Sequence, residues 1–430
     1  MNDNKLEHER LNDAAWKLLF EKYDILNHIE QDGCFQITSA QIKEFREPRL
    51  MAKFDHTINL PELFQKNKLA ILPVTRGDYV ISHFDAYHNF EPLTNDITRV
   101  SLPDYIQSLR VETITSEAVA LNCAFVSGIM ADFLEDDQLV PTISGRMGSG
   151  SFVFNIANTH NKSQCSIQVN NSQIEIDAGY EGLRNLALIE AKRDLSDDFL
   201  VRQLYYPFRT WNDRVNKEVK TVFLVYSNGI FHLYEYQFIN PMEYSSIKLV
   251  KQKNYMVEED TTITTEEIMQ LLDDVQVARE PEIAFPQADS FERVINLCEL
   301  LIEHPMTREE ITINYAFNER QTNYYTDAAR YLGLVDKQRS EDITFYLTPK
   351  GRSVLHLGYK QRQMALCECV LSHKVFADAL RLWFRQGEIS KRDIVTVMKN
   401  NALFNVKSES TYSRRASTIS GWLKWIVGLI

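Results

Sequence analysis

The chain alternates between helical and strand-like hydrophobic spacing, which predicts a mixed α/β protein. Apolar residues recur every three to four positions in three stretches, residues 14–29, 115–133 and 197–211. Short apolar runs bounded by turn residues predict strands at residues 34–37, 69–72, 79–81, 152–156, 173–177 and 186–192. Two further runs, 220–226 and 230–238, flank Ser227-Asn228-Gly229 and predict a hairpin. The Gly- and Ser-rich residues 144–151 predict a loop.

The last third of the chain has a different pattern, helix–turn–helix–helix followed by two short strands. Helices are expected at residues 291–303, from Met306 onward and at 320–332, and strands at 334–337 and 343–347. Thr307 and Glu310 have the spacing of a capping box. This order is the winged-helix layout, a helix-turn-helix variant. A looser second version follows, with helices at residues 374–385, 390–399 and 411–426.

These patterns divide the 430 residues into five parts. An acidic stretch with one expected helix, at residues 265–277, separates the winged helix from what precedes it. The parts are an N-terminal α/β domain (1–110), a central domain (111–255), an acidic linker (256–289), a winged-helix domain (290–357) and a second helical domain (358–430).

Composition narrows the class of protein. The chain is 44% hydrophobic, and no apolar run is long enough to span a membrane. The polar N-terminus lacks a signal-peptide core, and six cysteines without metal-ligand spacing predict free thiols in the cytoplasm. The net charge is −12, yet residues 358–430 hold twelve basic and five acidic residues. This asymmetry predicts a basic, nucleic-acid-binding surface, with ordinary charge patchiness as the alternative.

The candidate chemistry lies on two successive strands. Asp177 closes one strand, and Glu190 and Lys192 lie on the next, two apart and thus on one face. Two carboxylates and the main-chain carbonyl of Ala191 predict a Mg²⁺ site for phosphodiester hydrolysis. Lys192 would orient or help deprotonate the attacking water, or stabilise the pentacoordinate phosphorane. Glu175 is expected on the same side as Asp177. The alternative is an ordinary charged strand edge.

Three further segments suggest DNA contacts. The third winged-helix helix carries side chains able to bond base edges or phosphates, namely Arg320, Gln321, Asn323 and Arg330. Arg414 and Arg415 open the last helix and suit phosphate binding, and Arg146 adds charge to the Gly-rich loop. Winged helices also serve as protein–protein modules, so the alternative function of this segment is to bind another protein.

The order of elements and the acid…acid-x-Lys motif resemble the PD-(D/E)xK nuclease superfamily. Four phrases, at residues 46–51, 72–79, 144–150 and 286–291, are similar to phrases of bacterial type II restriction endonucleases that carry a C-terminal winged-helix region. One departure is that Ile176 precedes Asp177, where the name-giving motif has proline.

The resemblance implies a PD-(D/E)xK core and Mg²⁺-dependent, sequence-specific cleavage of double-stranded DNA that leaves 5′-phosphates. It further implies a homodimer, assembled in solution or on DNA, with a monomer that nicks each strand in turn as the alternative. A cognate methyltransferase as genetic partner and a bacterial cytoplasmic location are implied as well. By the same resemblance, Glu117 and Gln203 would complete the catalytic site, and Arg46, Arg49 and Arg76 would contact DNA. For Glu117 the alternative is an acid in the first turn of a helix, favoured there by the helix dipole, and for Gln203 it is a solvated helix face. Two rival functions remain: a repair or recombination nuclease that reads DNA structure, and a non-catalytic winged-helix regulator.

Overall fold

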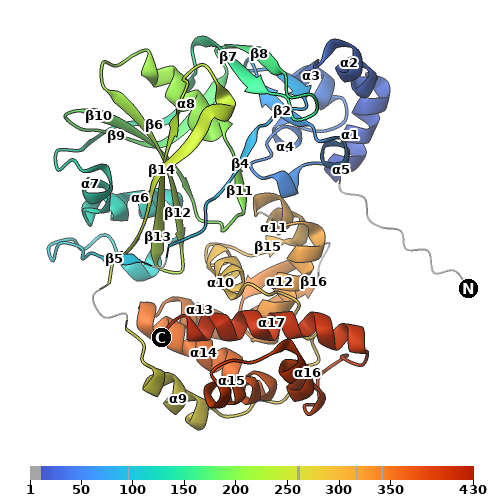
Figure 1. The fold of residues 1–430 in the computed structure, drawn as a ribbon, viewed down its shortest axis with the longest axis vertical. Helices are drawn as coiled ribbons and strands as arrows, with labels where there is room; N and C mark the ends of the chain where they lie inside the picture. The colour runs from blue at the N-terminus through green and yellow to red at the C-terminus, as the bar shows by residue number, and fades with distance from the viewer. Residues whose placement is uncertain (1–10, 95, 259–261, 316, 340–341) are drawn as a thin grey trace, which may run out of the picture.

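The computed structural model describes residues 11–94, 96–258, 262–315, 317–339 and 342–430, and there the protein is a mixed α/β structure, as predicted. The polar N-terminus and the centre of the wing turn, residues 340–341, lie outside the described residues. Figure 1 shows an N-terminal unit in blue, a central sheet in cyan to yellow, and a C-terminal helical unit in orange and red.

The N-terminal unit packs helices against a small antiparallel sheet. The strand order is β1 (Phe35–Thr38), β3 (Asp78–Ser82), β2 (Ala70–Pro73), within one residue of the predicted runs. The single helix predicted at 14–29 is wrong: Asp24, with a left-handed φ of 47°, separates two helices. The helices of this unit are α1 (Leu11–Lys22), α2 (Ile25–Asp32), α3 (Ser39–Lys43), α4 (Pro48–Met51) and α5 (Glu62–Asn67).

The central unit is built on a seven-stranded mixed sheet. Its order is β5 (Ile97–Arg99), β14 (Ile247–Met256), β13 (Ile230–Phe238), β12 (Glu218–Ser227), β10 (Asn185–Lys192), β9 (Gln173–Glu181) and β6 (Val140–Gly148). Strands β6, β9 and β10 are successively antiparallel, whereas β10 and β12 are parallel. The predicted hairpin is confirmed as β12 and β13, and Asn228 and Gly229 make its turn with φ values of 51° and 81°.

The loop predicted at residues 144–151 is wrong. Residues 144–148 finish β6, where Gly145 pairs opposite Ile176 of β9, and Ser151 begins β7 (Ser151–Ala157). Pairing across the sheet supplies these residues with backbone partners that local composition does not reveal. Strand β7 pairs with β8 (Gln164–Asn170), and the end of this hairpin reaches the N-terminal unit through Asn170 N–H and the Val74 carbonyl at 2.8 Å.

Helices cover both faces of the central sheet: α8 (Arg202–Asn212) on one face, and α6 (Glu117–Val126) and α7 (Ile129–Leu134) on the other. Along β10, Leu186 and Leu188 join the core under α8, and Ala187 and Ile189 join the core under α6 and α7. This alternation places the next even-numbered residue of β10, Glu190, on the α8 side.

Two predicted helices of the central unit have different boundaries. The helix expected at 115–133 is α6 and α7, separated at Gly128, which has a left-handed φ of 79°. The helix expected at 197–211 begins only at Arg202, because β11 (Asp198–Leu200) pairs with β4 (Tyr87–Asn89).

The described residues also form three short 3₁₀ turns, namely η1 (Thr57–Asn59), η2 (Val111–Thr113) and η3 (Tyr244–Ser246).

The helices and the two wing strands of the predicted layout are present, but Met306 and Thr307 form a short strand, β15, where the sequence predicted the start of the second helix, because they pair with Phe345 and Thr344. Thr307 and Glu310 form the predicted capping box at the start of the second helix. The elements are α10 (Phe291–Leu300), β15 (Met306–Thr307), α11 (Arg308–Asn314), α12 (Glu319–Tyr331), β16 (Val335–Arg339) and β17 (Ile343–Leu347), with the strands in the order β15-β17-β16.

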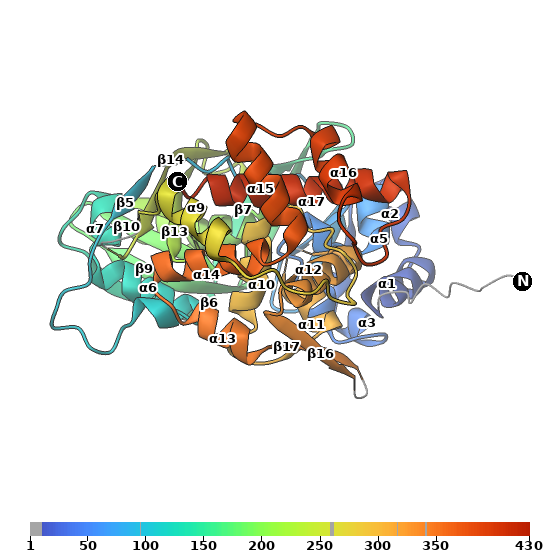
Figure 2. The ribbon, with the colours of Figure 1, turned by 90° about the horizontal axis from the view of Figure 1, so that it is seen from below.

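The remaining helices pack on the winged helix in one continuous core. It extends from Ile263 of the acidic segment to Ile426 near the C-terminus. In Figure 2, seen from below, the red C-terminal helices lie along one side of the orange ones. The helices are α9 (Thr265–Asp274), α13 (Pro349–Leu355), α14 (Tyr359–Leu371), α15 (Lys374–Gln386), α16 (Lys391–Lys399) and α17 (Glu409–Val427). Within the described residues, none of the helices has the length and apolar character needed to cross a membrane.

Candidate active site

Two side chains of β10 and one of α8 meet at the end of the central sheet. Glu190 and Lys192 project on the same side of β10, and Lys192 Nζ lies 2.6 Å from Glu190 Oε1. Gln203, in the first turn of α8, donates from Nε2 to the same oxygen at 2.8 Å. The side chains of Lys192 and Glu190 are only 16% and 11% exposed. Three of the residues expected from the sequence are therefore in direct contact and shielded from solvent.

Asp177 lies where β9 leaves its regular pairing. The ladder between β9 and β10 ends with Ala178 opposite Ile189. Beyond that pair, Asp177 Oδ2 accepts a hydrogen bond from the Ala191 N–H at 2.8 Å. The register between β9 and β6 also shifts on either side of Ile143, an irregularity of the kind that redirects side chains. The Asp177 carboxylate is thus bonded to the middle residue of the Glu-x-Lys motif.

Glu117 adds another carboxylate from the opposite helix layer. It is the first residue of α6, and Ser116 caps this helix by accepting from the Val119 N–H. Burial raises the pKa of Glu117, Lys192 lowers it, and Asp177 raises it further. The charges of Lys192 and Asp177 therefore both affect the ionisation of Glu117.

The cluster has more negative than positive charge. Burial raises the pKa of Glu190 to about 7, with Lys192 opposing and Asp177 adding to this rise. Burial disfavours the charge on Lys192, but Glu190, Glu117, Asp55 and Asp177 outweigh it and raise its pKa well above the usual value. One ammonium group therefore lies among several carboxylates, an arrangement that a cation would stabilise.

The donor set suits a hard divalent cation. Within the described ranges, no group of three or more His, Cys, Asp or Glu side chains has the geometry of a metal site by itself. Asp177 and Glu190 supply two carboxylates, and Ala191, whose N–H is bonded to Asp177, directly follows Glu190 and carries the expected main-chain carbonyl ligand. Magnesium commonly uses one or two carboxylates and completes its shell with water, so the residues fit Mg²⁺.

Glu175 and Arg146 pair with each other. Arg146 Nε lies 3.2 Å from Glu175 Oε1, and both side chains are more than half exposed, at 57% and 56%. Arg146 lies on strand β6 and not in a loop, because β6 and β9 pair there. The charge that Arg146 was expected to add to a Gly-rich loop lies instead on a paired strand of the sheet.

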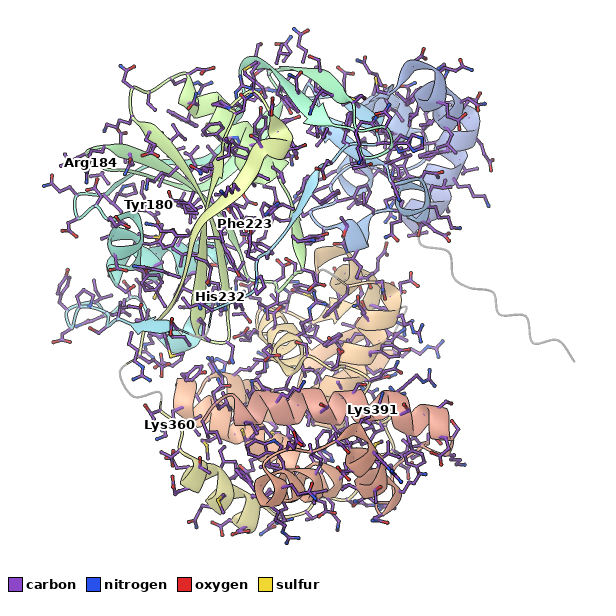
Figure 3. All side chains as sticks on the ribbon, viewed as in Figure 1. Tyr180, Arg184, Phe223, His232, Lys360 and Lys391 are labelled. Atoms are coloured by element: carbon purple, nitrogen blue, oxygen red, sulfur yellow. The ribbon has the colours of Figure 1, made fainter. Side chains whose placement is uncertain are left out.

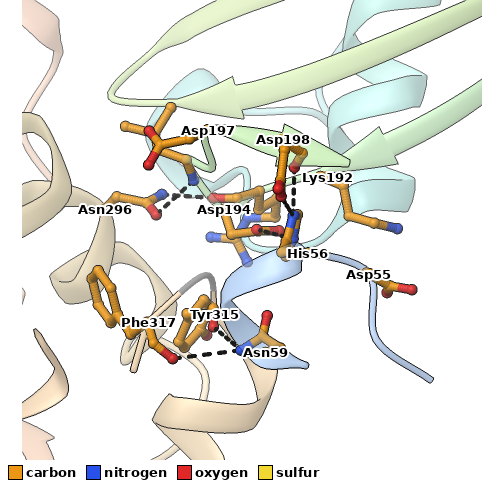
Figure 4. Close-up of polar contacts among 12 residues, drawn as sticks. Asp55, His56, Asn59, Lys192, Asp194, Asp197, Asp198, Asn296, Tyr315 and Phe317 are labelled. Atoms are coloured by element: carbon orange, nitrogen blue, oxygen red, sulfur yellow. Dashed lines mark hydrogen bonds and ion pairs between the residues drawn. The ribbon is translucent and has the colours of Figure 1, made fainter. Parts of the chain in front are cut away.

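A set of residues that the sequence did not indicate as functional surrounds the end of β10. His56 of the N-terminal unit lies between Asp194 and Asp198: Nε2 is 3.1 Å from Asp194 Oδ2, and Nδ1 is 3.6 Å from Asp198 Oδ1. Asp55, which directly precedes His56 in the chain, raises the pKa of both Glu190 and Lys192. Asp194 and Asp198 follow Lys192 closely in sequence, so their positions could have indicated them. His56 could not be predicted in this way, because it reaches these acids only through long-range packing. Figure 4 shows these contacts.

The predicted base-reading helix is α12, and its side chains differ in availability. Arg320 is exposed, with its guanidinium beside the Tyr324 ring. Gln321 closes a capping box with Asn318, and Arg330 is bonded to Asp327 at 3.0 Å. Asn323 is half-buried.

The start of α17 lies beside α12. Burial lowers the pKa of Arg415, whereas nearby Tyr324 of α12 raises it. Arg415 also donates to Gln287 Oε1 at 2.7 Å, while Arg414 is exposed. Figure 3 shows Lys391 on the same C-terminal unit, a further exposed cation. Tyr324 of α12 therefore acts electrostatically on Arg415 of α17, which is partly buried, whereas Arg414 faces solvent.

The three arginines of the N-terminal unit occupy different settings. Arg46 forms a 3.0 Å ion pair with Glu309 of α11 and also donates to Asn12 at 2.7 Å. Arg49 on α4 and Arg76 in the β2–β3 turn are exposed. Arg46 therefore joins two units, and the other two arginines are available to a ligand.

Comparison with known proteins adds three domain matches along the chain. They are DUF6996 over residues 13–81, DUF6997 over 82–256 and DUF7226 over 293–430, each described as a domain of unknown function. No curated protein and no solved structure matches the chain significantly. The chain is therefore similar, in order, to three domains of unknown function, and the Asp177, Glu190 and Lys192 cluster lies within the second match.

Proposed function

We propose that this protein is a Mg²⁺-dependent, sequence-specific endonuclease of double-stranded DNA, with a central domain of the PD-(D/E)xK type. The observation that carries the proposal is the strand-end cluster, in which Asp177 is bonded to Ala191 while Lys192 and Gln203 contact Glu190. Two acids and a lysine on adjacent strand ends are the groups that metal-assisted phosphodiester hydrolysis requires.

The order of elements supports the same proposal. Helix α6 is followed by the antiparallel strands β6, β9 and β10, then by helix α8, then by β12 parallel to β10. The hairpin of β7 and β8 is an insertion in this series. The two helices cover opposite faces of the sheet. The resemblance to the PD-(D/E)xK superfamily was drawn from this series of a helix, three strands, a helix and a strand, together with the motif of Asp177, Glu190 and Lys192.

The residues of the cluster would divide the chemistry among them. Asp177, Glu190 and the Ala191 carbonyl would hold the cation, which lowers the pKa of a bound water and offsets charge on the phosphate. Lys192, held by Glu190, would orient the attacking water or donate to the phosphorane oxygens. Gln203 would keep the Glu190 carboxylate in one orientation. Hydrolysis by this route leaves 5′-phosphate ends.

DNA recognition would come from the flanking units. Arg320 and Asn323 of α12 would contact base edges, and Arg414 would contact a phosphate nearby. Cutting both strands requires two active sites, which a homodimer assembled in solution or on DNA would supply.

Incubation with unmethylated plasmid and Mg²⁺ tests the proposal. We expect discrete fragments with 5′-phosphate ends, and none from Asp177→Ala or Lys192→Ala. A smear without defined ends would favour a structure-reading repair nuclease. DNA binding without cleavage on several unmethylated substrates would favour a non-catalytic regulator.

A further inference from the structure

We propose that His56 and Asn296 are positioning residues that hold the segment after Lys192, residues 193–198, from two sides. His56 belongs to the N-terminal unit and Asn296 to α10 of the winged helix. The candidate active site would then be aligned only when both flanking units are seated. This inference rests on the proposed function, since it assigns the two residues to the alignment of Lys192.

Asn296 bonds to the main chain immediately beyond β10. Its Nδ2 donates to the Arg193 carbonyl at 2.6 Å, and its Oδ1 accepts from the Leu195 N–H at 3.2 Å. The same Nδ2 lies 3.1 Å from Ser227 Oγ at the end of β12. Asn296 is 5% exposed within an otherwise apolar stretch of α10. A buried amide in such a setting needs its partners, and here they are the backbone on both sides of Asp194.

His56 holds the side chains of the same segment from the other unit. Its Nε2 is 3.1 Å from Asp194 Oδ2, and its Nδ1 is 2.6 Å from the Asp198 carbonyl. The neighbouring Thr57 N–H donates to both Asp198 carboxylate oxygens at 3.2 Å. His56, Asp194 and Asp198 are all less than one-tenth exposed, so water does not compete freely for these contacts.

The two flanking units also contact each other. Asn59, three residues after His56, donates to the carbonyls of Thr312 and Tyr315 at 3.0 and 3.1 Å. In Figure 4, the blue N-terminal segment and the tan winged-helix segments meet the green strand end at one junction. A displacement of either unit would therefore be transmitted to residues 193–198 and to Lys192, which directly precedes them.

Alignment of a catalytic group is worth a large factor in rate, because a misplacement of about 1 Å costs roughly a hundredfold. Asn296→Ala and His56→Ala should therefore lower the single-turnover cleavage rate by about ten- to a hundredfold. Their dissociation constants for DNA should stay within about twofold, measured with Ca²⁺ in place of Mg²⁺ to prevent cleavage.

Gln363→Ala is the matched control. Gln363 of α14 forms a buried amide pair with Asn228 of the β12–β13 turn, with Gln363 Nε2 2.8 Å from Asn228 Oδ1, and among the described residues its hydrogen bonds go to Asn228 and not to residues 193–198. This variant should loosen the junction yet cleave at the wild-type rate. Equal rate losses in Asn296→Ala and Gln363→Ala would overturn the proposal.

Amide hydrogen exchange gives a readout independent of cleavage. Peptides covering residues 190–200 should exchange at least about tenfold faster in Asn296→Ala and His56→Ala than in wild type or Gln363→Ala. If the wild-type protein does not cut DNA, the proposed function fails. The exchange comparison then still tests whether His56 and Asn296 hold residues 193–198. If an alanine variant does not fold, Asn296→Asp and His56→Gln replace it, and unchanged exchange in those variants overturns the proposal.

Discussion

Gln203 Nε2 lies 2.8 Å from Glu190 Oε1, the same oxygen that Lys192 Nζ contacts at 2.6 Å. One carboxylate oxygen therefore links the helix α8 to the two charged positions of β10. This arrangement leaves the other Glu190 oxygen as the one that a cation would take. Groups that orient a metal ligand in this way commonly set metal affinity.

Gln203→Leu should weaken Mn²⁺ binding and slow cleavage, each by about ten- to a hundredfold, because Glu190 loses its orienting donor. Calorimetric Mn²⁺ titration and single-turnover cleavage measure the two effects. Asn212→Ala, at the far end of the same helix with a surface contact to Asp213, serves as control. Unchanged Mn²⁺ affinity in Gln203→Leu would contradict the role assigned to this side chain.

Asp177→Asn and Lys192→Met should lower cleavage by at least about a hundredfold while DNA binding is retained, since both act on the reacting groups and not on recognition. Gel shifts in Ca²⁺ and cleavage in Mg²⁺ separate the two properties. Glu218→Gln is the matched control: Glu218 is exposed and pairs opposite Asn185, at the other end of the β10–β12 ladder. Activity surviving in Asp177→Asn would argue against the nuclease site.

The ion pairs of His56 predict a defined pH dependence of stability. Burial disfavours its charge, but hydrogen bonds to Asp194 and Asp198 outweigh burial and raise its pKa to about 10. The folded pKa exceeds the unfolded value of about 6.5, so the contribution is fully present below that pH and is lost as pH rises through 10. The difference in unfolding free energy between wild type and His56→Gln should therefore shrink from pH 7 to pH 10. Urea denaturation measures it, and a constant difference would refute the assignment.

Glu299 should stabilise the seating of the winged helix on the central sheet. Glu299 is 6% exposed, and its carboxylate accepts from the Asn228 N–H at 2.9 Å and from Ser227 Oγ at 3.0 Å. Glu299→Ala leaves these buried donors without a partner and should cost about 2 kcal/mol or more of unfolding free energy. Glu303→Ala, one turn later, removes only a 3.7 Å contact of a 44% exposed side chain and should cost less than about 1 kcal/mol. Equal losses in chemical denaturation would rule this explanation out.

The two classes of predicted DNA contact should differ in their salt dependence. Arg414→Ala removes one exposed charge that we propose to bind a phosphate, and it should reduce the slope of log affinity against log salt by about 1, for all sequences alike. Arg320→Ala should instead reduce discrimination at one base position by about 1–3 kcal/mol. Fluorescence anisotropy with specific and random duplexes distinguishes them. Identical behaviour of the two variants would contradict the assigned division of roles.

Local patterns predicted the elements that carry the chemistry but not all of their boundaries. The strand spacing correctly placed Glu190 and Lys192 on one side of β10, because alternation with period 2 depends only on neighbouring residues. The loop predicted around Gly145 was wrong, because pairing with β9 outweighs the glycine and serine content. The helix predicted from residue 197 started too early, because Phe199 pairs with His88 of a distant strand.

By itself, the sequence determined the strand-end motif, the hairpin turn at Asn228 and Gly229, and the capped winged-helix elements, since each depends on residues within one turn or one strand. Only the tertiary structure decided which groups meet that motif. Gln203 reaches Glu190 because α8 packs across the sheet, and His56 and Asn296 reach residues 193–198 because separate units dock there. Contacts between such distant residues are set by the packing of whole apolar faces, which no local pattern encodes.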